Sequence, residues 1–298
     1  MKTIIYATDC STNDASALKY AYRFSSIMNA DLHVLHVYEL PPITFSTIRT
    51  SESLKNRFHN DQIDLLDKYC KKHLKNEFNK HPITTHVIES DNVSKSIKRL
   101  SKTVTPDVII IGMKDKQSTR GFFSGNIAND LLDHVEVPVL MVPNNLVYDT
   151  ISTIVYATDF EKKDIQCVKK LVEIAQPFSA LIEVLHIYKT NEESAKKYME
   201  QFKELVFQQV SYKDITFKTI ASTKIKSGLL SVLNNEKASM LAMLERKHDW
   251  SYQSFFRKDV VKEMQDHIAI PLLAFSNNGP KTKGQNVNTL NTKNELAF

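Results

Sequence analysis

The sequence predicts an α/β protein that consists of two tandem copies of one five-stranded, parallel-sheet sandwich. The first observation is an internal repeat. IIYATD at Ile4–Asp9 returns as IVYATD at Ile154–Asp159, with residue numbers higher by 150. DHVEVPVL at Asp133–Leu140 returns as DHIAIPLL at Asp266–Leu273, with residue numbers higher by 133. The second observation is that short β-branched runs alternate with longer helix-like segments in each copy, a pattern typical of βα units and a parallel sheet.

In the first copy, five short runs rich in β-branched and apolar residues are predicted strands. They are Thr3–Thr8, Leu32–Tyr38, Ile83–Glu89, Val108–Ile111 and Val137–Val142. The segments between them are predicted helices, and these begin at Asn13, Ser51, Val93 and Asn126. Fully apolar runs such as VIII and VLMV suit a sheet that is covered on both faces.

The two repeat offsets also set the domain boundaries. They predict one domain over residues 1–145 and a second over 151–276, joined by the linker Asn144–Thr150. The difference in residue number between matching strings is smaller at the last repeated string than at the first. The second copy is therefore the shorter one. We expect that the missing residues were lost from the region before and within Ser51–Phe78. Residues 277–298 are rich in Asn, Thr and Lys without apolar periodicity, so we expect a disordered tail.

Composition argues against several classes of protein. The chain has 298 residues, of which 42% are hydrophobic, as is ordinary for a globular protein of two domains. Residues 1–8 run directly into a strand pattern without the basic start and apolar core of a signal peptide, so we expect a cytoplasmic protein with no membrane segment. Cys10, Cys70 and Cys167 show no CxxC spacing, which predicts reduced thiols rather than a disulfide framework or a zinc site.

The charge balance makes nucleic-acid binding a minor hypothesis. The net charge is +5, of which the tail contributes +2. One basic cluster in the third predicted helix is either a solvated face or a contact to a phosphate backbone. It consists of Lys95, Lys98, Arg99 and Lys102.

Half of the six glycines lie in one short stretch. Gly112, Gly121 and Gly125 follow the buried-strand pattern Val108–Ile111 and precede the helix-like run Asn126–Leu132. Glycines at such a place let backbone N–H groups approach a ligand closely, and the start of the following helix favours negative charge. The stretch therefore predicts a phosphate-binding loop.

These motifs resemble the universal stress protein family over nearly the whole chain and in tandem. Nucleotide-binding members carry an Asp after the first strand, a Val-containing turn after the second, and a Gly-x2-Gly-x9-Gly-Ser/Thr loop after the fourth. Asp9, Val37, Gly112 and Gly125 fit that pattern. The resemblance implies the adenine nucleotide alpha hydrolase-like fold, whose strand order 3-2-1-4-5 leaves a ligand crevice beyond the first and fourth strands.

The resemblance also implies which residues meet an adenine nucleotide such as ATP. Asp9 and the Ala7–Thr8 backbone would meet the adenine and ribose, and Val37 would pack on the base. The loop from Gly112 to Asn126 would hold the phosphates. The predicted site residues are Ala7, Thr8, Asp9, Val37, Gly112, Lys114, Gly125 and Asn126.

The loop departs from the family pattern at two positions. Asp115 replaces the middle glycine and Asn126 replaces the terminal Ser or Thr. A carboxylate about 5 Å from a phosphate oxygen would cost roughly 3 kcal/mol at an effective dielectric constant of about 20. Bridging Mg²⁺ or an outward-pointing Asp115 side chain would offset this cost, and Lys114 adds positive charge.

Several nearby side chains also have a structural interpretation. Asp9 is also explained, and more simply, by a cap on the first helix through a turn that contains Ser11 and Thr12, and the two roles are compatible. Cys10 is either an inert thiol or a redox-sensitive thiol at a helix N-terminus. His36 and His186 lie inside apolar strand patterns, which predicts hydrogen-bonded core histidines rather than ligands. No catalytic residue is predicted.

The second copy has lost the phosphate loop. Asp159 is retained. When the residue-number offset of the final strand is applied to the first-copy loop positions Gly112, Asp115, Gly125 and Asn126, none of the resulting positions holds a glycine. The residues found there are Glu245, His248, Lys258 and Asp259. We therefore expect a degenerate domain that packs and recognises other molecules. Phe122–Phe123 and Phe255–Phe256 match across the repeat, which predicts a shared packing or interface role.

Two functions from different classes follow. One is a cytoplasmic stress-response protein whose first domain binds ATP or another adenine nucleotide, with Mg²⁺, as a regulatory ligand and with at most slow hydrolysis. The other is a nucleotide-free scaffold of the same fold for an unknown protein partner. Val137–Val142 and Ile270–Phe275 are expected to pair within the chain as a pseudo-dimer, because exposed apolar edge strands are otherwise aggregation templates. The same grounds allow a further homodimer.

Overall fold

The computed structural model describes residues 2–11, 15–40, 52–78, 80–113, 125–144, 146, 150–245, 264 and 268–276. For Gly125 and Asn126 it describes the backbone alone. The predictions for Lys114–Ser124, for the paired phenylalanines, for the tail 277–298 and for most of the linker lie outside these residues.

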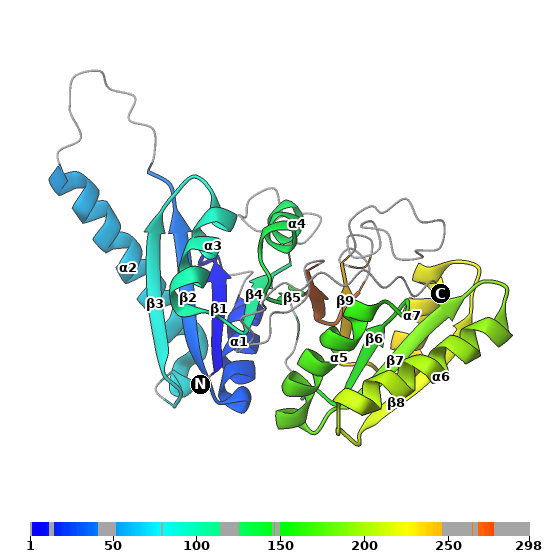
Figure 1. The fold of residues 1–298 in the computed structure, drawn as a ribbon. Coiled ribbons are helices and arrows are strands. Elements are labelled where there is room, and N and C mark those ends of the chain that lie inside the picture. Colours follow the sequence, from blue (N-terminus) through cyan, green and yellow to red (C-terminus); the bar gives the residue numbers. More distant parts are fainter. Residues whose placement is uncertain are drawn as a thin grey trace, which may run out of the picture.

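The described strands form one continuous sheet with the order β3-β2-β1-β4-β5-β10-β9-β6-β7-β8 (Figure 1). The first half of the sheet contains β1 (Lys2–Thr8), β2 (Ala30–Tyr38), β3 (Ile83–Glu89), β4 (Val108–Gly112) and β5 (Val139–Val142). The second half contains β6 (Thr153–Ala157), β7 (Leu181–Tyr188), β8 (Ile215–Ala221), β9 (Met240–Leu244) and β10 (Leu272–Phe275). Neighbouring strands within each half are parallel. The predicted order 3-2-1-4-5 is confirmed, and the second half repeats it.

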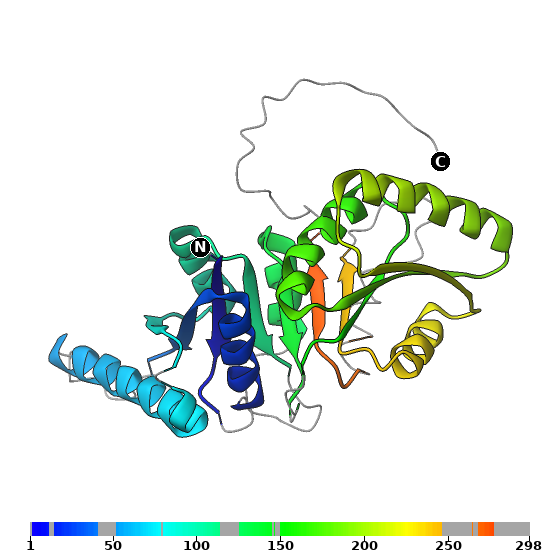
Figure 2. The same cartoon turned by 90° about the horizontal axis from the view of Figure 1, so that it is seen from below.

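Helices cover both faces of the sheet (Figure 2). One apolar core contains residues of α1 (Ala15–Met28), α2 (Glu52–Leu74), α5 (Lys162–Ala175) and α6 (Glu192–Gln209). The other contains residues of α3 (Val93–Val104), α4 (Gly125–His134) and α7 (Ile225–Asn235). Short 3-10 turns, η2 (Lys75–Glu77) and η3 (Gln176–Phe178), follow α2 and α5. This two-layer cover explains why the central strands are apolar on both sides.

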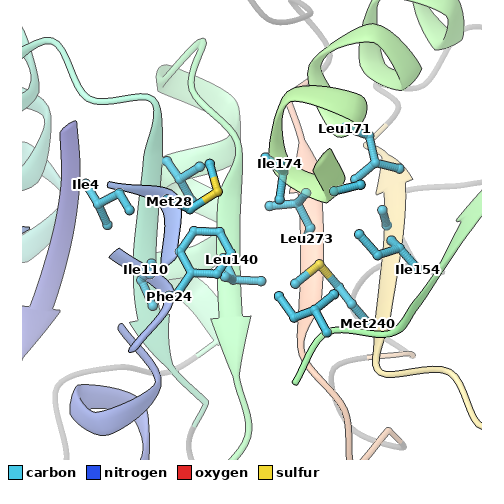
Figure 3. Packing of buried hydrophobic residues seen from close by; sticks show 14 of the residues in the cluster. Ile4, Phe24, Met28, Ile110, Leu140, Ile154, Leu171, Ile174, Met240 and Leu273 are labelled. Carbon is cyan, nitrogen blue, oxygen red and sulfur yellow. The ribbon is translucent and has the colours of Figure 1, made fainter. Parts of the chain in front are cut away.

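The two halves join through the final strands, as predicted. β5 and β10 pair antiparallel, with Leu140 opposite Leu273, and Figure 3 shows these two side chains between the cores of the halves. The strands begin at Val139 and Leu272, slightly later than expected. The preceding prolines, Pro138 and Pro271, have no N–H to donate to a ladder, although each carbonyl accepts a bond from the neighbouring strand.

Further contacts tie the halves together on the face of α1 and α5. The Phe24 and Phe178 rings stack with centroids 5.5 Å apart. The Lys170 ammonium lies 3.3 Å from the Asp107 carboxylate across the junction. The pseudo-twofold pairing is therefore backed by packing and by an ion pair. None of the helices in the described part of the chain is long and apolar enough to cross a membrane.

Candidate functional site

A crevice edge forms where β1 and β4 end side by side. The chain leaves β1 toward β2 and β3, then returns to β4 on the other side of β1. Ala7 of β1 is in register with Ile111 of β4, so the carboxyl ends of the two strands meet at one edge. In open α/β sheets this switch point is where ligands bind.

Hydrogen bonds to Thr8 fix the end of β1. His36 Nδ1 lies 3.1 Å from the Thr8 carbonyl oxygen, which can only accept, so this nitrogen carries the proton. The Cys10 N–H donates to Thr8 Oγ1 at 3.0 Å, and Cys10 has a left-handed φ of 59°. The chain therefore turns sharply after β1. The prediction that His36 is a hydrogen-bonded core histidine is confirmed.

Asp9 closes the next turn. Its Oδ1 accepts a hydrogen bond of 2.8 Å from the Ser11 N–H, so the expected turn is confirmed. The start of α1 before Ala15 lies outside the described residues, and the capping role stays a prediction. The Asp9 side chain is half-buried at the crevice edge.

The other predicted site residues lie at the same edge or in the core beneath it. Val37 is buried near the end of β2, in the core shared with α3 and α4. Gly112 is the last residue of β4, and the following Met113 N–H donates to the Val142 carbonyl at 2.7 Å. Gly125, expected in the loop, is instead the first residue of α4, and Asn126 follows it. A helix that starts there directs N–H groups toward a ligand. Lys114 and Asp115 lie outside the described residues.

The second half repeats the backbone arrangement at the end of β6. His186 Nδ1 lies 2.9 Å from the Thr158 carbonyl oxygen, and the Phe160 N–H donates to Thr158 Oγ1 at 3.0 Å. Phe160 has a φ of 66°, close to that of Cys10. His186 is thus a hydrogen-bonded core histidine as well.

The register of β9 corrects one predicted correspondence. Ile154 pairs with Met240 in the second half, as Ile4 pairs with Val108 in the first. Met240 is therefore the counterpart of Val108, and the difference in residue number between the halves at β9 is smaller by one than expected. The counterpart of Gly112 is therefore Leu244, and Glu245 corresponds to Met113. The expected offset holds only from the final strand onward, where Leu272 corresponds to Val139. The second copy still has no glycine at this place.

A buried carboxylate organises the turn after β6. Asp164 is fully buried and accepts hydrogen bonds from the Tyr156 hydroxyl at 2.7 Å and from the Thr158 hydroxyl at 2.8 Å. The Asp159 and Glu161 N–H groups also donate to it. Burial, and then the Asp164 charge, raise the pKa of Tyr156 well above its usual value, so its hydroxyl stays a donor. Sequence reasoning missed this network; Asp164 lies in the first turn of α5, where its side chain forms a capping box with Glu161.

Comparison with known proteins agrees with the α/β fold. The model of the universal stress protein family matches residues 1–143. Residues 1–143 belong to the universal stress protein family. No curated protein matches the chain in sequence.

Solved structures extend the likeness to the second half of the sheet. A universal stress protein from Archaeoglobus fulgidus DSM 4304 covers 92% of this chain and 98% of its own, with a TM-score of 0.69 and 13% identity. A putative universal stress protein from Pseudomonas aeruginosa UCBPP-PA14 covers 93% of each chain, with a TM-score of 0.60 and 12% identity. At these identities the likeness shows that both halves share the fold of these proteins. It shows nothing about ligands.

The universal stress protein half therefore brings Thr8, Asp9 and Gly112 to one edge, with Val37 buried in the core beneath. Sequence reasoning named Thr8 for its backbone and His36 as a hydrogen-bonded core histidine, but it missed that the Thr8 hydroxyl accepts from the Cys10 N–H and that the His36 ring bonds to the Thr8 carbonyl. The repetition of Thr and His in both copies of the repeat was the available signal. Within the described ranges, no three His, Cys, Asp or Glu side chains gather as a metal site.

Proposed function

We propose that the first half of this universal stress protein binds an adenine nucleotide, such as ATP with Mg²⁺, as a regulatory ligand in a cytoplasmic stress response. The observation that carries the proposal is that Asp9 directly follows β1 and Gly112 ends the adjacent β4, while α4 begins at Gly125. Backbone N–H groups at such an edge can donate to a phosphate, and the Asp9 carboxylate can accept from ribose hydroxyls.

Each residue has a role in this proposal. Asp9 and the Ala7–Thr8 backbone bind the adenine and ribose end, and Val37 packs beneath the base. The phosphates are held by Gly112, Lys114, Gly125 and Asn126. If Mg²⁺ accompanies the nucleotide, it would supply positive charge that offsets the repulsion between the Asp115 carboxylate and the phosphates. With no general base assigned, we propose at most slow ATP hydrolysis.

Calorimetric titration of the full chain with ATP and Mg²⁺ tests the proposal, with a matched pair of variants. Asp9→Ala removes a proposed ligand contact and is expected to weaken binding at least tenfold. Asp159→Ala changes the corresponding residue of the second half and is expected to leave ATP affinity unchanged. Equal effects of the two substitutions would place the nucleotide elsewhere.

Asp115 limits the affinity in this proposal. Asp115→Gly restores the family glycine and removes a like charge, so ATP should bind more tightly by up to about 3 kcal/mol. Gly125→Val should weaken binding, because a side chain then stands at the start of α4. ATP affinity that neither substitution alters would refute the site.

A second candidate is a nucleotide-free scaffold for a protein partner. It is favoured by Leu244, which stands where the first half has Gly112 and leaves the second half without a phosphate loop. If wild-type protein shows no heat of binding with ATP, and Asp115→Gly shows none either, the scaffold is the better explanation.

A further inference from the structure

A cavity lies in the second half, on the face of the sheet that carries α5 and α6. Its volume is about 840 Å³, within the range of small-molecule sites. It opens between the two helices, above the ends of β6 and β7, and thus on the opposite face from α4 and α7. Its apolar wall consists of Phe160, Tyr188, Ala195, Tyr198, Phe202 and Leu205.

The first half shows what normally fills this place. The buried residues Leu66, Cys70 and Leu74 of α2 match Phe202, Val206 and Val210 at the end of α6, at one constant offset in residue number. The same offset places Phe58, His59 and Gln62 of α2 on Ser194, Ala195 and Tyr198 of α6. Two ring-bearing side chains of the first half are therefore replaced by the two smallest side chains of this stretch.

In the first half those rings pack on Tyr38. The Phe58 ring lies 5.6 Å from the Tyr38 ring at an interplanar angle of 52°. The His59 ring lies 5.8 Å from it at 46°, and His59 Nδ1 is 2.9 Å from the Tyr38 hydroxyl. α2 thus supplies a phenyl ring and an imidazole that meets a tyrosine hydroxyl.

In the second half the tyrosine remains as Tyr188, but Ser194 and Ala195 are too short to reach it in the same way. The corresponding space is part of the cavity. Tyr198 and Leu205 at its border are 37% and 38% exposed. A molecule with an apolar body would cover both.

Phe160 closes one end of the cavity in a strained conformation. Its φ of 66° is rare for a bulky residue and costs about 1–2 kcal/mol. The ring packs 4.3 Å from His186 and 5.8 Å from Phe202, measured between centroids. Because Cys10 has a similar φ of 59° in the first half, the turn itself is common to both halves, and in the second half it places a ring at the end of the cavity.

We propose that this cavity binds a small, uncharged, planar aromatic molecule of one or two rings that carries an N–H donor, of the indole or benzimidazole class. The ligand takes the place that Phe58 and His59 fill in the first half, with its ring packed on Tyr188. Asp159, Lys162 and Lys189 also border the cavity, and the wall of ring and aliphatic side chains favours an uncharged ligand body.

The donor requirement follows from the partner that Tyr188 already has. Lys196 and, more weakly, a hydrogen bond from the Tyr188 hydroxyl lower the pKa of the Glu192 carboxyl. A hydroxyl that donates its single proton to Glu192 retains only acceptor capacity. A ring N–H of the ligand satisfies that acceptor.

The test uses the full chain and a small set of probes, followed by calorimetry and by NMR of the ligand. Indole and benzimidazole are expected to bind. Benzofuran, which has the shape of indole without its N–H, is expected to bind at least fivefold more weakly, and cyclohexanol more weakly still. Saturating ATP should leave indole affinity unchanged, which separates this site from the proposed nucleotide site. Equal affinity for cyclohexanol and indole would overturn the aromatic assignment.

Two reciprocal variants locate the site. Ser194→Phe with Ala195→His rebuilds the first-half arrangement in the second half and should weaken indole binding at least tenfold, with thermal unfolding by circular dichroism as the folding control. Phe58→Ser with His59→Ala opens the first half and should raise the stoichiometry from about one indole to about two. If the filled variant does not fold, the opened variant carries the test alone. Wild-type affinity in the folded filled variant, or an unchanged stoichiometry in the opened one, overturns the proposal.

Discussion

The two halves of the sheet share a hydrogen-bonded frame at the strand ends but differ in what stands on it. In both, a histidine bonds to the carbonyl of a threonine that ends the first strand (Thr8) or directly follows it (Thr158), and the second residue after that threonine adopts a left-handed conformation. Leu244, however, stands where the first half has Gly112. Ser194 and Ala195 of α6 stand where α2 has the rings of Phe58 and His59. The two halves thus keep the backbone geometry that the fold requires, while the side chains at the strand ends and between the helices differ.

The largest expected effect on the free energy of unfolding comes from a substitution in the turn after β6. Asp164→Ala should lower the free energy of unfolding by about 3 kcal/mol or more, because the Tyr156 and Thr158 hydroxyls and two N–H groups lose a buried acceptor together. Urea unfolding followed by circular dichroism measures this loss.

Tyr156→Phe is the matched control for that network. It removes one donor and leaves the carboxylate its other three bonds, so a loss of only about 1 kcal/mol is expected. A loss as large as that of Asp164→Ala would mean that tyrosine packing, and not the carboxylate, holds the turn.

Substitution of the two residues with left-handed φ, Cys10 and Phe160, by glycine is expected to change the stability by an intermediate amount, with opposite sign in the two halves. Cys10→Gly relieves strain at a half-buried side chain and should stabilise the protein by up to about 1 kcal/mol. Phe160→Gly relieves the same strain but loses the ring that packs on His186, Tyr198 and Phe202, so a net loss of about 1–3 kcal/mol is expected. Thermal unfolding of both variants decides; a stabilising Phe160→Gly would show that the ring contributes little.

The strand order could be predicted through the resemblance to the universal stress protein family, and the joining strands because a repeated string marks the final strand in both copies. The start of the final strands could not, because Val137 fits the apolar pattern and only the missing N–H of Pro138 delays the ladder. For the crevice edge, Asp9 and Gly112 carried enough signal, since parallel strands bring their carboxyl ends together.

The cavity and the Asp164 network could not be found in the same way. The offset between the halves falls from β7 to α6 and again from α6 to β9, and no repeated string marks α6. Only the buried positions of the folded helices show that Ala195 stands where His59 does. A network such as that of Asp164 depends on which atoms face each other in the core, and spacing alone does not reveal this.

The smallest expected effect is a pH dependence of opposite sign in the two halves. On the outer strands of the first half, His33 Nδ1 and His86 Nε2 lie 2.8 Å apart, and the same places in the second half hold Glu183 and Lys218. Burial lowers the pKa of His33, against the Asp31 charge that raises it. Burial and then the His33 charge lower the pKa of His86. Burial raises the pKa of Glu183, although Lys218 opposes it.

The lowered histidine pKa values contribute stability that is present above pH 6.5, the usual value, and is lost as the pH falls through the folded-state values. The raised pKa of Glu183 contributes stability that is present below pH 4.5 and is lost as the pH rises through its folded-state value. Between pH 7 and pH 4.5, acidification should thus weaken β2 and β3 and strengthen β7 and β8, each by less than about 1 kcal/mol. Amide hydrogen exchange, corrected for intrinsic rates, reports on the strands separately. His86→Gln should flatten the first response and Glu183→Gln the second; slopes of the same sign in both halves, or slopes that survive these substitutions, would show that other groups control the response.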